Sequence, residues 1–199
     1  REEPPSNAVP SLTATDSDTL LPTINSRCRT IGLRPMPADL IEETLMTRYH
    51  ARPDEANLLA HLADGRLGWA IRAHQEPSVL QERRAQLETL HQALNGSLVA
   101  RFSLAETLAR KADTLPPLLR TWLSWWRDLA LMTYGCGSNE AISNVDESGK
   151  LHELAGRLSR AAVFASLAQT EAALRQLGQN ANARLVLENV LLTYPSRTE

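Results

Sequence analysis

The sequence contains the side-chain types that enzymes use, but it does not arrange them in a recognisable catalytic motif. Its only Gly-Lys pair, Gly149-Lys150, is followed by Leu151 and lacks the upstream glycine of a phosphate-binding loop. The patterns GxGxxG, GxSxG and HExxH do not occur. None of the histidines has a second histidine and a carboxylate at metal-ligand spacing; they are His50, His61, His74, His91 and His152. We therefore expect no resident metal and no enzymatic activity of the chain's own.

Cysteines and arginines are the remaining candidates for chemistry. Cys28 and Cys136 are far apart and form no CxxC pattern, which excludes a cysteine-rich zinc site and a disulfide scaffold. No His or Asp is placed by sequence to activate Cys136 as a nucleophile. Arg66 with Arg72, and the pair Arg83-Arg84, form small basic patches, which are more typical of a charged surface than of a nucleic-acid contact.

Composition limits the class of protein. The chain has 199 residues, with 21 Lys and Arg against 23 Asp and Glu, and a formal net charge of −2. This length suffices for a sizeable core, and the near-neutral balance argues against an autonomous nucleic-acid-binding protein. No apolar window reaches the ~18 residues of a membrane span, and no apolar stretch follows the start at Arg1. We therefore expect a cytoplasmic chain with no membrane association.

The pattern along the chain separates a proline-rich start from a long helical part. Residues 1–35 hold two apolar patches, at 9–14 and 30–33, that predict one or two short strands. Two short helices, over 37–49 and 53–64, and a third that follows the interruption at 65–71 and runs to about 75 predict a small bundle. Five or six helices follow Pro77 and predict a second, larger bundle; their ranges are 78–95, 103–111, 116–134, 147–158, 160–177 and 183–193.

Three local features of the larger bundle can be predicted. Ser103 with Glu106 forms a capping-box pattern that predicts a helix start at Ser103. Helix 116–134 has one wide apolar face, which predicts either core packing or contact with an adjacent subunit; its residues are Leu118, Trp122, Trp125, Leu129 and Met132. Helix 160–177 carries small and apolar residues on one side, namely Ala161, Phe164, Ala165, Ala168 and Ala172.

A segment near the start of the chain resembles a known family. Glu2-Glu3-Pro4-Pro5 precedes an apolar stretch that ends in Thr-Ala-Thr-Asp, and residues 20–28 then read Leu-Leu-Pro-Thr-Ile-Asn-Ser-Arg-Cys. This order closely resembles the second half of the AAA+ core of DNA sliding-clamp loader subunits. Residues 101–106, 122–129 and 180–189 resemble the collar domain of the delta-prime group within that family.

The resemblance implies a mainly α fold in three parts. Residues 1–35 would be the C-terminal end of an AAA+ α/β core, residues 36–76 a three-helix lid, and residues 77–199 an all-helical collar through which subunits assemble into a ring. The implied function is that of a non-hydrolysing stator in the clamp loader of DNA polymerase III, a DNA-directed DNA polymerase. The implied partners are the delta and tau/gamma subunits, with the sliding clamp and primer-template DNA reached through the complex. ATP and magnesium would be bound by a neighbouring subunit, and this chain would hold no cofactor.

The resemblance also implies a role for one arginine. In the family, the arginine of Ser-Arg-Cys is a finger that reaches the ATP of the adjacent subunit, and the matching residue here is Arg27, between Ser26 and Cys28. A planar, permanently charged guanidinium suits the oxygens of a transferring phosphoryl group. The alternative role for Arg27 is an ion pair with a local carboxylate.

Two further positions resemble the family's nucleotide sensors. Thr15, or Thr13 beside it, stands in the region of the first sensor, where a hydroxyl bonded within its own turn is the alternative. Gly68 and Trp69 stand where ATP-binding members have arginine and aspartate, which argues against ATP binding at this chain's own site. We expect Trp69 to pack between lid and core.

Two other functions are compatible with the sequence. One is a fragment of a tau/gamma-type clamp loader ATPase. The other is an unrelated all-helical adaptor in which Ser26-Arg27-Cys28 is coincidental.

Overall fold

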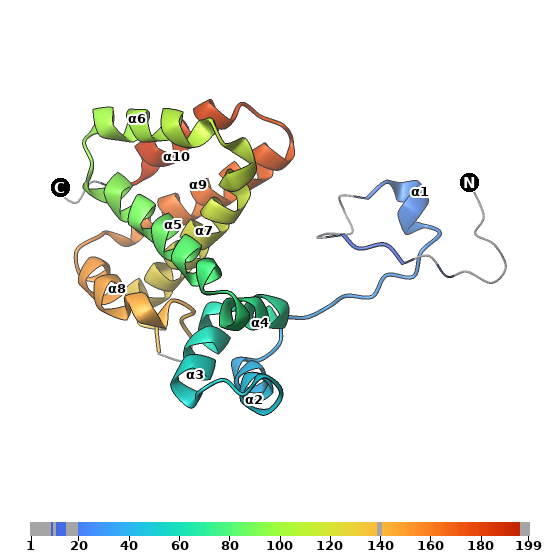
Figure 1. Cartoon of the computed structure of the whole chain (residues 1–199). Helices are drawn as coiled ribbons and strands as arrows, with labels where there is room; N and C mark the ends of the chain where they lie inside the picture. The colour runs from blue at the N-terminus through green and yellow to red at the C-terminus, as the bar shows by residue number, and fades with distance from the viewer. Residues whose placement is uncertain (1–8, 10, 15–19, 139–140, 196–199) are drawn as a thin grey trace. The chain divides into compact units, whose positions relative to one another are not determined.

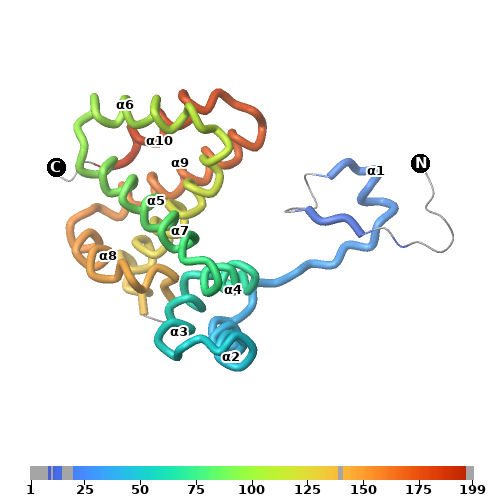
Figure 2. The backbone as a smooth tube through the Cα atoms, viewed as in Figure 1, coloured from blue at the N-terminus to red at the C-terminus, as the bar shows by residue number. Residues whose placement is uncertain are grey.

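The computed structural model describes residues 9, 11–14, 20–138 and 141–195 of a chain that forms two compact units, 1–34 and 35–199. In the described part of the first unit, the only regular element is the short helix α1 (Pro22–Asn25). The second unit contains helices α2 to α10, which Figure 1 labels and Figure 2 traces along the backbone. The mainly helical class is therefore confirmed.

The prediction of strands at 9–14 and 30–33 is wrong for the residues that the structure describes there. Val9, residues 11–14 and residues 30–33 adopt no regular secondary structure. Val9 is 92% exposed and Leu33 is 93% exposed. A strand needs neighbouring strands to satisfy its backbone hydrogen bonds and to cover its apolar face. The described residues of this unit provide no such neighbours, so the described apolar residues of these patches are exposed.

Helices α2 (Ala38–Tyr49), α3 (Pro53–Leu62) and α4 (Leu67–Gln75) form the small bundle that the sequence predicts. Pro53 occupies the first turn of α3, where its missing N–H costs nothing, and acidic residues follow it at the positive end of the helix dipole. Helix α2 ends at His50, which adopts the left-handed conformation with φ of 57°. Ile41, Leu45 and Leu59 are fully buried in the bundle's own core.

Gly65 makes the turn between α3 and α4 possible. Its φ is +78°, and a Cβ placed there would lie 2.3 Å from the Cβ of Pro35. The Gly65 carbonyl also accepts a hydrogen bond of 3.0 Å from the backbone N–H of Met36. Only a residue without a side chain allows both the left-handed turn and this close approach of the chain.

In the described residues of the large bundle, the structure has six helices, in agreement with the five or six predicted, and two short 3₁₀ turns. The elements are α5 (Pro77–Asn95), α6 (Leu98–Ala109), η2 (Ala112–Thr114), α7 (Leu115–Thr133), η3 (Val145–Glu147), α8 (Ser148–Ala155), α9 (Arg160–Gly178) and α10 (Ala183–Thr193). Helix α7 packs against α5, α8 and α9, and α10 packs against α6 and α9.

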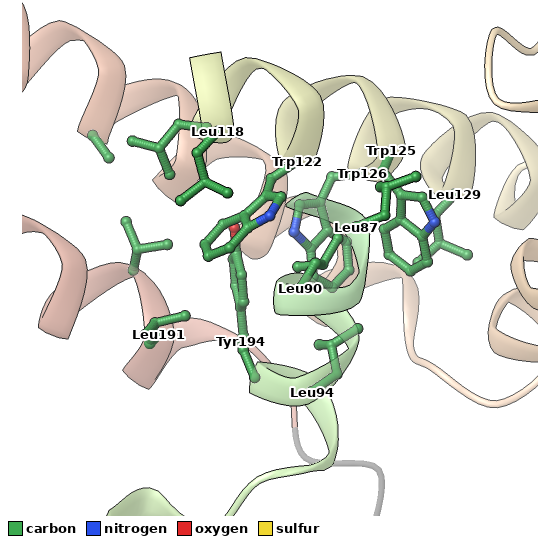
Figure 3. Packing of buried hydrophobic residues seen from close by; sticks show 14 of the residues in the cluster. Leu87, Leu90, Leu94, Leu118, Trp122, Trp125, Trp126, Leu129, Leu191 and Tyr194 are labelled. Carbon is green, nitrogen blue, oxygen red and sulfur yellow. The ribbon is translucent and has the colours of Figure 1, made fainter. Parts of the chain in front are cut away.

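The core of the large bundle is centred on the tryptophans of α7. Trp122, Trp125 and Trp126 are each 0% exposed, and Figure 3 shows them among leucines of α5 and beside Tyr194. The Trp126 and Tyr194 ring centroids lie 5.0 Å apart. Trp122 donates its Nε1 hydrogen to the Gln86 carbonyl at 2.8 Å, which satisfies the one polar atom of that ring. The tryptophan face is therefore core within this chain and not a subunit contact.

The predicted start of α6 is wrong by more than one turn. Helix α6 begins at Leu98, and its N-cap is Ser97, whose Oγ accepts a hydrogen bond of 3.3 Å from the Ala100 N–H. Ser103 lies inside the helix, where its carbonyl accepts a hydrogen bond from the Thr107 hydroxyl. Because Ser97 caps the N-terminus of α6, the pattern of Ser103 and Glu106 lies inside the helix and has no helix end to cap.

The apolar side predicted for α9 faces solvent. Phe164 is 57% exposed, and Ala161, Ala165 and Ala168 are exposed beside it. The buried side instead holds Val163, Ser166, Thr170 and Ala173. The two hydroxyls are buried without penalty because each donates to the carbonyl of the preceding turn, and Thr170 Oγ1 also lies 2.7 Å from the Tyr194 hydroxyl.

Candidate functional site

Arg27 lies directly after α1, in a turn held by local hydrogen bonds. The Arg27 backbone N–H donates to the Ile24 carbonyl at 3.1 Å, and Ser26 Oγ donates to the Thr23 carbonyl at 3.3 Å. The Arg27 and Cys28 side chains are exposed, and Cys28 is a free thiol. No carboxylate among the described residues pairs with Arg27. Asp16 and Asp18, the acidic residues nearest to it in sequence, lie outside the described residues.

The two sensor-like positions have different outcomes. Thr15 lies outside the described residues, and Thr13 is exposed in a stretch without regular secondary structure. Gly68 is exposed near the start of α4, and a Cβ added there would meet no atom within 4 Å. The backbone at position 68 therefore leaves room for a Cβ, and the residue there has no guanidinium to offer.

Trp69 packs against the core of the small bundle. The ring is half-buried on α4, with the Arg66 guanidinium 6.0 Å from its centroid. This distance is within the range of a cation–π contact. The packing that the structure describes for Trp69 lies within its own bundle, and the expected packing between lid and core stays a prediction.

A hydrogen-bonded cluster that the sequence did not predict joins the small bundle to the large one. Asp128 is 0% exposed, and its Oδ2 accepts hydrogen bonds from the Ser143 N–H at 2.9 Å and the Asn144 N–H at 2.7 Å. The neighbouring Arg127 pairs with Asp128 at 3.2 Å and with Asp64 of the small bundle at 2.9 Å. Partial burial lowers the pKa of Arg127, but hydrogen bonds and attraction from Asp64 and Asp128 outweigh it and raise that pKa.

Arg101, in one of the collar-like stretches, has a structural role. Its side chain is buried and donates to the carbonyls of Leu191, Tyr194 and Pro195. Carbonyls at the C-terminal end of a helix lack intrahelical partners and carry partial negative charge. Arg101 therefore caps α10 from α6, a contact between residues some 90 positions apart that no local pattern indicates.

Neither a metal centre nor a membrane span is found in the part of the chain that the structure describes. No group of His, Cys, Asp and Glu side chains there is clustered closely enough to hold a metal ion. Among the described helices, none combines the length and apolar character needed to cross a bilayer.

Comparison with known proteins identifies the family. Residues 1–37 match the family described as "DNA polymerase III, delta subunit", and residues 77–194 match the family described as "DNA polymerase III, delta subunit, C terminal". No curated protein matches the chain. The second match covers more than half of the chain and spans the helices of the large bundle, α5 to α10. The chain therefore belongs to the DNA polymerase III delta subunit family.

Proposed function

We propose that this chain is the C-terminal part of a delta-prime clamp loader subunit and that it contributes Arg27 in trans to ATP bound by a neighbouring subunit. The observation that carries the proposal is an exposed arginine, in a Ser-Arg-Cys turn, within a segment that matches the delta subunit family. Hydrogen bonds of the backbone and of the Ser26 hydroxyl hold the turn after α1, and the Arg27 side chain there is exposed.

The chemistry asked of Arg27 is electrostatic. In phosphoryl transfer, charge spreads over the γ-phosphoryl oxygens, and a guanidinium stabilises them through two parallel N–H donors. Arginine fingers contribute about 10³ to 10⁵ in rate in the NTPases where they have been measured. The chain itself would bind no ATP, because Gly68 offers no guanidinium at the second sensor position.

The remaining parts then take the roles that the family resemblance implies. Residues 1–35 would end an AAA+ core, the small bundle would be the lid, and the large bundle would be the collar that assembles with the delta and tau/gamma subunits. ATP and magnesium belong to the neighbouring subunit, and the sliding clamp and primer-template DNA are reached through the complex. The subunit acts as a non-hydrolysing stator, and we expect it in the cytoplasm.

The proposal is tested by Arg27→Lys in the full-length subunit within the complete clamp loader. Lysine keeps the charge but loses the planar fork, so DNA-stimulated ATP hydrolysis at the contacted site should fall steeply, by about 10³-fold or more. Arg29→Lys is the matched control, since Arg29 is also exposed and lies two residues further along. Size-exclusion chromatography should show the same assembly for both variants. Unchanged hydrolysis in Arg27→Lys would remove Arg27 from the mechanism.

Of the alternatives, the unrelated adaptor is wrong, because the chain belongs to the DNA polymerase III delta subunit family. The other alternative, a fragment of a tau/gamma-type ATPase, can be distinguished from the proposed stator by experiment. Such a subunit would keep its own nucleotide site, so equilibrium binding of labelled ATP to the isolated full-length subunit would favour it over the stator.

A further inference from the structure

A pocket of about 330 Å³ lies where α4 of the small bundle meets α5 and α7 of the large bundle. We call it the arginine pocket, because Arg66 and Arg72 of the small bundle, Arg83 of α5 and Arg120 of α7 all line it. The sequence groups Arg66 with Arg72, and Arg83 with Arg84, in two small basic patches that are more typical of a charged surface than of a nucleic-acid contact. The fold brings them together and adds Arg120, which is distant from them in sequence.

The pocket has an excess of unpaired positive charge. Arg83 is held by Asp146 at 2.7 Å and by the Asn144 side chain at 2.6 Å, so its charge is balanced. Among the described residues, no carboxylate pairs with Arg66, Arg72 or Arg120, and all three side chains are exposed.

Among the residues that the structure describes, one acidic side chain lines the pocket beside these three arginines. It is Glu82, which accepts a hydrogen bond from Gln86 at 3.4 Å. The chain as a whole carries a formal charge of −2, so this local excess is not a reflection of overall composition.

The pocket also offers a flat surface beside the charges. Trp69 lines it, and the Arg66 guanidinium lies over the Trp69 ring at 6.0 Å. Nucleobases stack on aromatic rings and on guanidinium planes, while arginine forks bind phosphate oxygens through paired N–H donors. At the α7 wall, the Thr121 hydroxyl donates to the Gln86 side chain at 2.6 Å and the Ser124 hydroxyl accepts from the Asn144 side chain at 3.2 Å, so the charged and aromatic side chains are the groups left for a ligand.

We propose that the arginine pocket binds phosphate groups of single-stranded nucleic acid, with a base against the Arg66–Trp69 stack. A free nucleotide presents the same phosphate and base, so the experiment has to separate the two sources. The inference does not rest on the proposed role of Arg27, since the pocket is built from residues of the two bundles only. Failure of either proposal leaves the other standing.

The test is fluorescence anisotropy of a fluorescein-labelled oligothymidylate titrated with the 199-residue chain at several salt concentrations. The double variant Arg72→Gln with Arg120→Gln should weaken binding and reduce the magnitude of the slope of log K against log salt by about 1.4, at about 0.7 for each lost phosphate contact. Trp69→Leu, which keeps an apolar group against the small bundle, should weaken binding by about tenfold through lost stacking. Because Arg72 and Arg120 are exposed, the double variant should fold normally.

A control of equal charge is Arg110→Gln with Arg175→Gln. These arginines pair with Glu106 and Glu171 on exposed helix surfaces outside the pocket. Equal loss of affinity in the two double variants would overturn the proposal, because general electrostatics would then suffice.

Competition then separates the sources of phosphate. Displacement by thymidine monophosphate or ATP would make the ligand a free nucleotide, whereas displacement only by unlabelled oligonucleotide supports a strand. Equal displacement by polyglutamate, or no oligonucleotide binding at low salt, would contradict the assignment.

Discussion

The segment around α1 and the two bundles differ in what determines their conformation. Helix α1 buries no residue, and the hydrogen bonds found among the described residues of the turn after it join near neighbours in the chain. Helix α7, in contrast, buries three complete tryptophan side chains. Burial of apolar surface is the main source of folding free energy, so the bundles stabilise themselves and the α1 segment gains little from its own packing.

We infer that the bundles provide the stability of the chain and that the α1 segment provides the residue for its function. Under the proposed function, Arg27 acts on ATP from a segment that buries little of its own surface. The neighbouring subunit binds that ATP. The two bundles are joined by the ion pair between Arg127 and Asp64. Asp128, next to Arg127, accepts hydrogen bonds from the backbone of Ser143 and Asn144. Substitutions in the two regions should therefore separate stability from function.

The largest expected contrast in stability is between Trp126 and Ile31. Trp126 is 0% exposed and Ile31 is 75% exposed. Trp126→Ala should lower the free energy of unfolding by about 3 to 5 kcal/mol, because it removes a large buried ring and leaves a cavity. Ile31→Ala should change it by less than about 0.5 kcal/mol. Urea unfolding followed by far-ultraviolet circular dichroism measures both free energies. Similar losses in the two variants would contradict the conclusion that the large bundle is stabilised by its buried core and the first unit is not.

A smaller contrast is expected between two glycines of the small bundle. Gly65→Ala should destabilise by about 1 to 3 kcal/mol, because it forces a left-handed φ on alanine and drives a Cβ into Pro35. Gly68→Ala should be neutral or stabilise by up to about 1 kcal/mol, since the site is helical and open. Thermal unfolding compares the two, and a stable Gly65→Ala variant would show that the turn can rearrange.

Local sequence patterns predicted the helices well where one strong signal marked an end. Asn95-Gly96 correctly ended α5, and α10 was predicted at its observed bounds, 183–193. The start of α6 was predicted wrongly because both Ser97 and Ser103 have the side chain of an N-cap residue, and Ser97 is the one that lies at the helix end. The buried face of α9 is not the side on which the sequence groups small and apolar residues, because Ser166 and Thr170 form hydrogen bonds within the helix and Thr170 also contacts Tyr194.

The candidate sites also differ in whether a local sequence pattern predicts them. Arg27 could be singled out because its neighbours in sequence form the motif. The arginine pocket could not, because Arg120 joins the other arginines only after α7 packs beside α5. Asp128 was missed for the same physical reason: its hydrogen-bond donors at Ser143 and Asn144 come from a later loop. Contacts between distant segments depend on the completed packing, and no short window of sequence contains them.

The smallest predicted effect concerns acid and the stability of the large bundle. Glu147, on η3, pairs with His91 at 2.7 Å and with Lys150 at 2.8 Å. Burial raises the pKa of Glu147, but hydrogen bonds from His91 and Lys150 outweigh this and lower the pKa from 4.5 to about 2. A carboxylate with a lowered pKa stabilises the fold above its unfolded pKa, and this stabilisation is lost as the pH falls through the folded pKa.

Glu147→Gln should therefore be less stable than the unaltered chain by about 1 to 2 kcal/mol near neutral pH, after allowance for solvent screening. The difference should shrink as the pH falls from about 4.5 through about 2, because the Glu147 carboxylate is progressively protonated over this range. Glu106→Gln is the control, because Glu106 forms an exposed pair with Arg110, worth less than about 0.5 kcal/mol. Urea unfolding across this pH range measures the differences. A Glu147→Gln difference that stayed constant with pH would mean that shape and hydrogen bonding, and not charge, make Glu147 stabilising, because only the ionised carboxylate is lost on acidification.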